Sequence, residues 1–456
     1  MFVAVLPIIV LLGVIALQAI YSNDFRPYVP LILGAVTALA IGMKRGIPWK
    51  KLSKETFQTV GSVSSALVLY MIIGPTISVW MASGTLPTLI LWGSEVLTPM
   101  TYLPISFLIM GLVTILMGTG MTSIGTMGVA LVSIGLACGY PIWLLAAVLG
   151  SGAFWGNACS PMSGINLVSL TMTEADSGDF VYYMIPRLLP PFIVCIIAYA
   201  VMGVVYKPES TGQALSHFEA LAQVFPPSII SIIPIVVLVV LLLRRVPSLI
   251  VFFTTIVVSC IVAVAMGYVS ISQLPGIIVS GYRYTGENME LRALLNRGGI
   301  MSTVSIVYTV MVAMLFGGSF KASGCLNQLM ESLTKHVKGV EGLRRMAMGC
   351  TIVTTLVTSS STMGTALSGA LFTPKMKEEG LNPEEATATL GPTAAMVSPL
   401  IPWGAAGTAV ITFLGVPLSD PKSLLYIPFS FCCFLGPLWL FIKKPKKEVV
   451  AKTQES

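Results

Sequence analysis

The chain has 456 residues, of which 55% are hydrophobic and only 10% are charged. A soluble globular protein carries roughly 25% charged residues, because it needs them to cover its surface. This composition excludes a cytosolic enzyme, a secreted disulfide scaffold and a nucleic-acid binder, and it predicts an integral membrane protein. The formal net charge of +7 then reflects Lys and Arg held in cytoplasmic loops rather than an acidic partner.

Long apolar runs predict membrane-spanning helices rather than a β-barrel. Residues 2–20 and 229–243 are apolar almost throughout, whereas barrel strands alternate over segments of about 10 residues. A spanning helix takes about 20 residues, so the chain has room for at most roughly 13 crossings. We therefore predict an all-α integral membrane protein with about 10–13 transmembrane helices.

The apolar runs follow one another along the whole chain. After 2–20 they lie at 28–43, 57–82, 101–117, 121–137, 141–159, 186–206, 229–243, 247–267, 301–320, 346–373, 386–415 and 423–442. Residues 44–54 hold five basic residues and residues 443–447 hold four. By the positive-inside rule both segments are cytoplasmic. This predicts a multi-pass plasma-membrane protein with both termini inside and an even number of crossings.

An internal repeat is the most informative feature of the sequence. Three segments recur in the same order, with 82–86 matching 322–326, 126–131 matching 362–367, and 160–162 matching 398–400. The spacing is nearly constant, which predicts two homologous halves at about 57–170 and 301–415.

Charge predicts how these halves are oriented. Residues 321–345 carry five Lys or Arg residues, whereas the equivalent residues 85–100 carry only Glu95. Equivalent loops on opposite sides of the membrane mean inverted repeats, which are typical of secondary transporters. The predicted organisation is an N-terminal two-helix segment (1–56), a first inverted repeat region (57–206), a linker with connecting helices (207–300), a second inverted repeat region (301–442) and a basic cytoplasmic tail (443–456).

Each half contains two interruptions rich in Gly, Ser, Thr and Pro. They lie at 118–123 and 157–166 in the first half, and at 358–362 and 398–404 in the second. Unpaired backbone groups are costly inside a bilayer, so such breaks predict broken or re-entrant helices that line a cavity. Carbonyl, Ser, Thr and Asn oxygens suit Na⁺, and half-helix N-termini attract carboxylates. The alternative is that small residues permit close packing while the hydroxyls bond to their own helices.

These interruptions supply the candidate site. The predicted substrate- or ion-binding residues are Thr119, Thr122, Ser123, Asn157, Ser160, Ser163, Asn166, Ser360, Ser361, Thr362, Ser398, Trp403 and Gly404. The predicted structural helix breaks are Gly118, Gly120, Pro161, Gly164, Pro399 and Pro402. We expect both sets to surround one central cavity. No nucleophile–base pair or metal-ligand cluster occurs in the sequence, so we predict neither an enzyme nor a metal site.

At these positions the sequence resembles the NhaC-type Na⁺/H⁺ antiporters of the ion transporter superfamily. The segments 72–87, 118–128, 152–163 and 398–403 carry the resemblance. It implies a bacterial inner-membrane antiporter with inverted repeats, which exchanges Na⁺ for H⁺ by alternating access. Some members of that family couple Na⁺ or H⁺ to carboxylates such as malate and lactate.

The chain departs from that family pattern where buried acids are expected. It has Asn157 after Gly156 where the family usually has Asp, Gly164 after Ser163 where the family has another Asp, and Gly404 in place of Asn. An exchanger of Na⁺ and H⁺ normally needs a carboxylate that titrates near neutral pH. The alternative is therefore a Na⁺-coupled or exchange transporter of a small carboxylate or amino acid, in which the substrate supplies the negative charge.

Two other charged residues are weaker candidates to replace the missing buried carboxylates. Glu95 could be a membrane acid or a solvated interfacial residue, and Lys321 could be a buried cation or a snorkelling helix-end lysine. His217 and His336 lie in charged loops. The predicted partners are the lipid bilayer together with Na⁺ and H⁺ or a small organic solute. No cofactor is predicted besides Na⁺ as the transported or coupling ion, and a homo-oligomer is left open.

Overall fold

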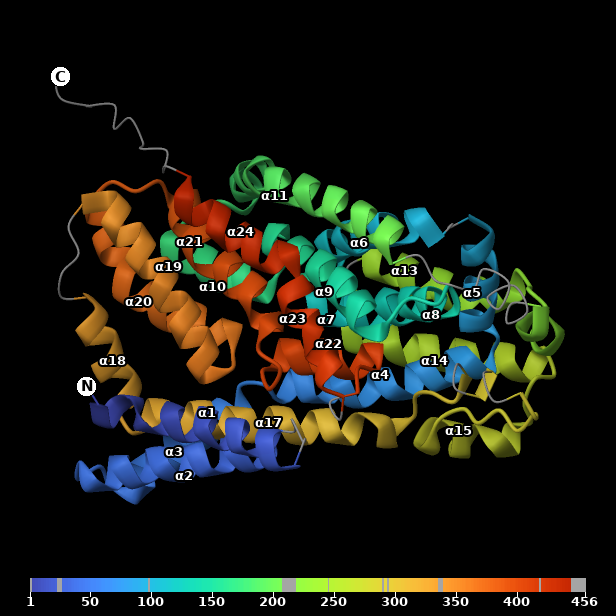
Figure 1. Ribbon diagram of the computed structural model, residues 1–456, viewed down its shortest axis with the longest axis horizontal. Coiled ribbons are helices and arrows are strands. Elements are labelled where there is room, and N and C mark those ends of the chain that lie inside the picture. Colours follow the sequence, from blue (N-terminus) through green and yellow to red (C-terminus); the bar gives the residue numbers. More distant parts are fainter. Residues whose placement is uncertain are drawn as a thin grey trace.

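The structure is a computed structural model that describes residues 2–22, 27–96, 99–206, 219–244, 246–288, 291–292, 295–334, 339–417 and 420–443. Helices make up the regular structure of these residues, and no β-strand occurs among them (Figure 1). The predicted all-α class is confirmed.

The helices fall into two successive sets. The first set is α1 (Phe2–Ser22), α2 (Tyr28–Lys44), α3 (Trp49–Gly61), α4 (Ser64–Ala82), α5 (Thr85–Val96), α6 (Pro99–Met117), α7 (Gly120–Ser123), the π-helix η1 (Ile124–Gly128), α8 (Val129–Ala137), α9 (Ile142–Cys159), α10 (Gly164–Thr173) and α11 (Ser177–Val205). The second set is η2 (Ile230–Ile232), α13 (Ile233–Leu243), α14 (Ser248–Ala265), η3 (Ile271–Gln273), α15 (Leu274–Ser280), α17 (Ile300–Ala322), α18 (Cys325–Thr334), α19 (Gly339–Thr358), α20 (Ser361–Glu378), α21 (Pro383–Val397), η4 (Ser398–Leu400), α22 (Ala405–Leu414), η5 (Pro421–Leu425), α23 (Tyr426–Phe429) and α24 (Phe431–Ile442).

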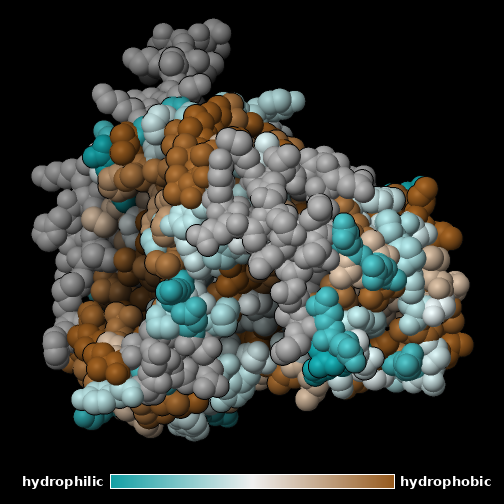
Figure 2. Space-filling model, turned by 45° about the vertical axis from the view of Figure 1, so that its right-hand side comes forward, coloured by the Kyte–Doolittle hydropathy of each residue, from teal (hydrophilic) through white to brown (hydrophobic). Residues whose placement is uncertain are grey.

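Several of these helices are suited to cross a membrane. Within the described residues, six are long and apolar enough, or eight if each of two bent pairs counts as one span, and five shorter apolar helices accompany them. Ile193, Ile197 and Val201 of α11 recur every four residues and are 46–59% exposed, as expected for a lipid-facing stripe. Figure 2 shows hydrophobic residues over much of the visible face. The chain is a multi-pass membrane protein, and the count of 10–13 crossings stays a prediction.

The order of helices in the first half recurs in the second. α4 and α5 bend by 71° at Ser83 and Gly84, and α17 meets α18 at Ser323 and Gly324. Gly84 and Gly324 have φ values of +71° and +72°, which a glycine adopts without strain. The repeated Ala-Ser-Gly segment thus makes the same turn in each half. The inverted orientation of the halves stays a prediction.

Helices of each set pack against helices of the other set. α14 and α15 lie against α4, whereas α2 and α3 lie against α17. Similarly, α10 packs against α20 and α21, while α22 packs against α7, η1 and α9. α1 begins and α24 ends at the same end of the long axis (Figure 1). Each set therefore places its short half-helix, α10 or α22, among helices of the other.

Glycine allows α6 and α9 to approach closely. A methyl group at Gly156 would overlap the Gly111 carbonyl oxygen and lie 2.8 Å from the Thr114 Cβ. A methyl group at Gly152 would lie 2.6 Å from the Phe107 carbonyl oxygen. Both obstacles include backbone atoms, which cannot move without shifting a helix.

We expect Gly156→Ala to lower the free energy of unfolding by about 1–3 kcal/mol, the usual cost of overpacking. Thermal unfolding of the purified protein in detergent measures the change. Gly349→Ala on α19 is the matched control, because its methyl group would meet no atom within 4 Å and alanine favours helix by about 1 kcal/mol. Equal stability of the two variants would contradict the close α6–α9 contact.

Candidate ion-binding site

Four helix breaks interrupt the two halves. The first break (118–119) separates α6 from α7, and the second (160–163) separates α9 from α10. The third break (359–360) separates α19 from α20, and the fourth (398–404) separates α21 from α22 and begins with η4. Gly118, Pro161, Pro399 and Pro402 lie inside these breaks. Gly120 and Gly164, by contrast, are the first residues of α7 and α10, because each break ends one residue earlier.

Hydrogen bonds between neighbouring residues stabilise the first break. Gly118 has a φ of +77°, and the Thr119 Oγ1 accepts the N–H of Thr122 at 3.1 Å as an N-cap. The Ser123 Oγ donates to the Thr119 carbonyl oxygen at 3.0 Å. The π-helix η1 follows directly, and such turns often mark functional sites.

Asn166 organises the second break. Its Nδ2 donates to the carbonyl oxygens of Asn157 at 3.0 Å, Ala158 at 3.1 Å and Ser160 at 2.8 Å. The first two are end carbonyls of α9, which have no partner within the helix, and Ser160 is the C-cap residue that follows it. The Asn166 Oδ1 and the Ser163 Oγ are buried, and neither has a hydrogen-bond partner in the structure.

Asn157 and Ser160 lie beside this cap. Asn157 is in the last turn of α9 with 4% of its surface exposed, and the hydrogen bond described for it is accepted by its backbone. The Ser160 Oγ donates to the Ile115 carbonyl oxygen of α6 at 2.9 Å. The predicted ligand Ser160 therefore uses its proton to tie the second break to α6.

The third break contains a strained serine. Ser359 has a φ of +56°, which is uncommon for a residue with a side chain. Its Oγ is buried without a hydrogen-bond partner. Ser360 caps α20 by accepting the N–H of Met363 at 3.3 Å. Ser361 and Thr362 belong to the first turn of α20, where Ser361 is partly buried and Thr362 is exposed.

The fourth break is held by groups on both sides. The Ser398 Oγ donates to the Ala395 carbonyl oxygen at 2.8 Å, and the Tyr426 hydroxyl donates to the Pro399 carbonyl oxygen at 3.1 Å. The indole N–H of Trp403 is buried without a partner. Gly404 is the N-cap residue of α22.

Neighbouring breaks contact each other in pairs. A methyl group at Gly118 would lie 3.0 Å from the carbonyl oxygen of Met162, so the first and second breaks touch. A methyl group at Gly404 would lie 3.3 Å from the carbonyl oxygen of Ser359, so the third and fourth breaks touch. Each pair combines the two breaks of one half.

Tyr70 of α4 connects the two pairs. Its hydroxyl lies 2.7 Å from the Met121 sulfur beside the first break. The same hydroxyl donates to the Ala405 carbonyl oxygen at the fourth break at 3.0 Å. The breaks of both halves therefore meet in one region. Tyr70 was not predicted from the sequence, because nothing around a single tyrosine in an apolar run indicates which distant residues its hydroxyl contacts.

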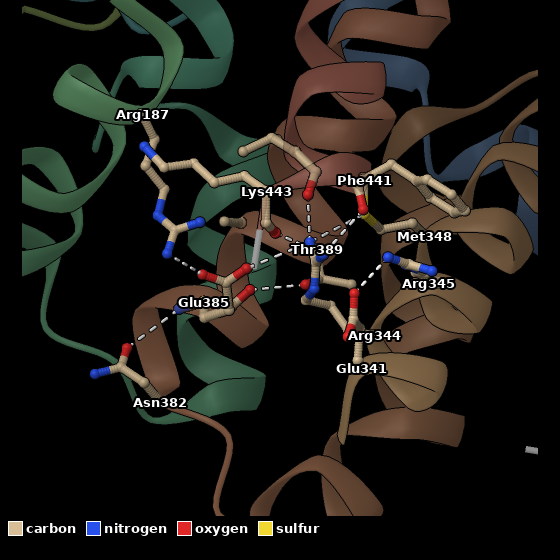
Figure 3. Close-up of polar contacts among 12 residues, drawn as sticks. Arg187, Glu341, Arg344, Arg345, Met348, Asn382, Glu385, Thr389, Phe441 and Lys443 are labelled. Carbon is tan, nitrogen blue, oxygen red and sulfur yellow. Dashed lines mark hydrogen bonds and ion pairs between the residues drawn. The ribbon is translucent and has the colours of Figure 1, made fainter. Parts of the chain in front are cut away.

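One buried carboxylate lies away from the breaks. Among the acidic side chains that the structure describes, Glu385 is the buried one, with 1% of its surface exposed. It lies 2.7 Å from an Nη of Arg187 and 3.5 Å from an Nη of Arg344 (Figure 3). Glu385 precedes Ser398 by 13 residues, which is about 20 Å of helix. Glu385 is therefore a buried acid outside the family positions Asn157 and Gly164, and it is paired and distant from the breaks.

The other charged candidates face solvent or fall outside the described residues. Glu174 is exposed and pairs with Lys377 at 2.7 Å, and Asp176 caps α11. Lys321 is partly exposed in the last turn of α17. The histidines and the Glu95 side chain lie outside the part of the chain whose side chains are described. Within that part, no group of three or more His, Cys, Asp or Glu residues lies together.

The family follows from comparison with known proteins. The model of the Na⁺/H⁺ antiporter family matches residues 174–442. The chain belongs to the Na⁺/H⁺ antiporter family. This agrees with the resemblance found in the sequence.

Similar full-length proteins share this transport class. The chain is 26% identical to the Na⁺/H⁺ antiporter NhaC of Alkalihalophilus pseudofirmus, over 94% of this chain and 93% of that protein. It is 27% identical to the arginine/ornithine antiporter ArcD of Halobacterium salinarum, over 91% and 85%. It is 25% identical to the malate-2H⁺/Na⁺-lactate antiporter of Bacillus subtilis, over 94% and 92%. These relatives are antiporters rather than enzymes, and this family member is a secondary transporter of the NhaC type.

Proposed function

We propose that this antiporter binds Na⁺ at a neutral, oxygen-lined site where the helix breaks meet. The observation that carries the proposal is a set of three buried oxygens without hydrogen-bond partners: Asn166 Oδ1, Ser163 Oγ and Ser359 Oγ. An unsatisfied buried polar group costs about 1–3 kcal/mol. Such groups call for an explanation such as a bound ion or water. Hydroxyl, amide and carbonyl oxygens are the ligands that broken helices offer to Na⁺.

Alternating access is the second part of the proposal. The breaks of the two halves are joined through Tyr70, and α10 and α22 each pack among helices of the other half. In inverted repeats, rocking of one half against the other exposes a central site to each side in turn. The positive-inside rule supports a cytoplasmic position for both termini.

The counter-transported species in this proposal is H⁺, as in the relatives named NhaC. One observation favours a small carboxylate or amino acid as a second candidate. Within the described side chains, the buried carboxylate Glu385 lies about 20 Å of helix from the fourth break, so the breaks offer no described acid to carry the proton. The names of two relatives, an arginine/ornithine antiporter and a malate/lactate antiporter, add support for this candidate.

A Na⁺ pulse distinguishes the two candidates. Purified protein is placed in proteoliposomes with a trapped pH dye, the membrane potential is held at zero, and no organic solute is present. We expect a saturable pH change that protein-free vesicles lack. Absence of a pH change, together with Na⁺-dependent uptake of a labelled carboxylate or amino acid, would replace H⁺ by the organic solute.

We expect Ser163→Ala and Ser359→Ala each to weaken Na⁺ affinity by about tenfold, which is about 1.4 kcal/mol, without loss of stability. The hydroxyls make no hydrogen bond within the protein, so their removal costs the fold nothing and removes only a ligand. Binding of ²²Na⁺ and thermal unfolding measure the two effects.

Ser231→Ala is the matched control for these variants. The Ser231 Oγ is also buried and unpartnered, but Ser231 lies in η2, ahead of α13. Unchanged Na⁺ affinity in both Ser163→Ala and Ser359→Ala would show that these oxygens are only packed, and would contradict the proposed ligands.

A further inference from the structure

A cavity of about 500 Å³ is lined by residues outside the four breaks. It is lined by residues within 280–283, at the end of α15, by residues within 296–303, which lead into α17, and by the last turn of α22. Its apolar wall includes Ile77, Val129 and Phe413. Its polar wall is formed by Arg283, Asn296, Arg297, Tyr282, Ser280 and Thr412.

The charge of this cavity is positive. Arg283 and Arg297 both line it. The ion pairs among the described residues include neither arginine, and no hydrogen bond is described for either guanidinium. Arg292 of the same segment differs, because it donates to the carbonyl oxygens of Gly286 at 2.8 Å and Thr285 at 3.4 Å.

Arg297 is more buried than Arg283. Arg283 is exposed, whereas Arg297 is only partly exposed. Burial lowers the pKa of the Arg297 guanidinium from its ordinary value, although a guanidinium remains charged in proteins. Arg297 has therefore lost part of its water shell without gaining an anion from the described residues. A charge in this state favours an incoming anion.

Neutral donors complete the polar wall. The Asn296 Oδ1 accepts the N–H of Tyr284 at 2.7 Å, and this bond fixes the amide while its NH₂ group makes no described hydrogen bond. Tyr282 and Thr412, which each carry a hydroxyl group, line the same cavity. These groups can donate to oxygens that a single guanidinium does not reach.

We propose that this cavity binds a small organic anion with one or two carboxylates, held by Arg297 and assisted by Arg283 and Asn296. A guanidinium matches a carboxylate with two parallel N–H···O bonds. The volume of about 500 Å³ lies within the range of small-molecule sites, and an apolar wall with a few polar groups is their usual lining. The carbon skeleton contacts Ile77, Val129 and Phe413.

The cavity adjoins the region of the helix breaks. The Phe413 ring packs on the Tyr70 ring with the centroids 5.6 Å apart. The Tyr70 hydroxyl contacts the first and fourth breaks. A solute in the cavity is thus separated from the breaks by these two rings. The inference rests on the proposed function only in that this transporter moves a solute, and it does not require Na⁺ to bind at the breaks.

The test uses the purified full-length protein in detergent, in Na⁺-free potassium buffer. Isothermal titration calorimetry is performed with succinate and with succinamide, its uncharged analogue of similar shape. We expect saturable succinate binding, and binding of succinamide that is at least about tenfold weaker. Arg297→Gln should weaken succinate by at least about tenfold, and Arg297→Lys, which keeps the charge but not the bidentate geometry, by less.

Arg244→Gln is the matched control, because Arg244 is exposed beyond the end of α13 and does not line the cavity. Thermal unfolding of Arg297→Gln at the wild-type temperature shows that this variant is folded, and its binding of ²²Na⁺ keeps failure of the Na⁺ site distinguishable from failure of this site. Three results would each overturn the inference: no succinate binding by the wild-type protein, equal affinity for succinamide, or unchanged succinate affinity in Arg297→Gln. Displacement of succinate by chloride at equal concentration would make this an inorganic-anion site and would also overturn it.

Discussion

Replacing Glu385 by Gln is expected to lower the free energy of unfolding by about 3–5 kcal/mol, because it leaves two buried guanidinium groups without their anion. Arg187 comes from α11, Arg344 from α19 and Glu385 from α21, so three helices meet at one carboxylate (Figure 3). Arg187 is 4% exposed and Arg344 is 1% exposed. Water therefore cannot replace the lost carboxylate.

The same cluster holds the end of α24. Arg344 donates to the carbonyl oxygens of Leu440, Phe441 and Lys443, the last two at 3.0 and 2.8 Å. These carbonyls end the helix and have no partner within it, and a cation at a helix C-terminus is favourable. Loss of Glu385 removes the anion that positions Arg344, so the last turn of α24 should loosen as well.

Thermal unfolding in detergent measures this prediction, and Glu384→Gln is its matched control. Glu384 is the preceding residue in the first turn of α21 and is partly exposed, so its loss should cost less than about 1 kcal/mol. The double variant Arg187→Met with Glu385→Gln should recover part of the lost stability, since it removes one of the two stranded cations. A Glu385→Gln variant as stable as Glu384→Gln would show that the ion pair contributes nothing.

Replacing Asn166 by Ala is expected to weaken Na⁺ affinity by about a hundredfold, which is about 2.7 kcal/mol. The amide has two functions at the second break: its Nδ2 donates to two carbonyls at the end of α9 and to that of the C-cap residue Ser160, and its Oδ1 is one of the proposed ligands. Losing the cap also lets the carbonyls at the break move, which disturbs the remaining oxygens. The unsatisfied carbonyls should cost about 1–3 kcal/mol of stability.

Asn382→Ala separates capping from ion binding. The Asn382 side chain caps the start of α21 by accepting the N–H groups of Glu384 and Glu385 at 2.9 and 3.2 Å. Its loss should cost about 1 kcal/mol and leave Na⁺ affinity unchanged. Binding of ²²Na⁺ and thermal unfolding are measured on both variants. If Asn166→Ala lost only stability, Asn166 would be a helix cap and not a ligand.

Tyr70 and Asn166 show how far sequence reasoning reaches into the candidate site. Asn166 was among the predicted residues because it stands in a Pro- and Gly-rich interruption, and such interruptions act locally on the backbone. Tyr70 was not, because its partner Ala405 is 335 positions away. No local pattern marks that contact. The assignment of the predicted residues to one binding site stays a prediction.

The membrane class, the helical architecture, the repeated order of segments and the family could all be predicted from the sequence. Composition and apolar runs reflect transfer between water and lipid, and Gly and Pro restrict the backbone around themselves, so both effects can be read along the chain. The positions of the four breaks followed to within a few residues.

The charges and oxygens that lie together could be identified only in the folded chain. Glu385 stands beside Glu384 in the sequence, yet packing withdraws Glu385 from water and pairs it with Arg187 and Arg344, while Glu384 stays partly exposed. Arg297 became notable because the fold encloses it in a cavity without an anion among the described residues. Burial and pairing depend on segments that are distant in the chain, and the free energy of a charge depends on both.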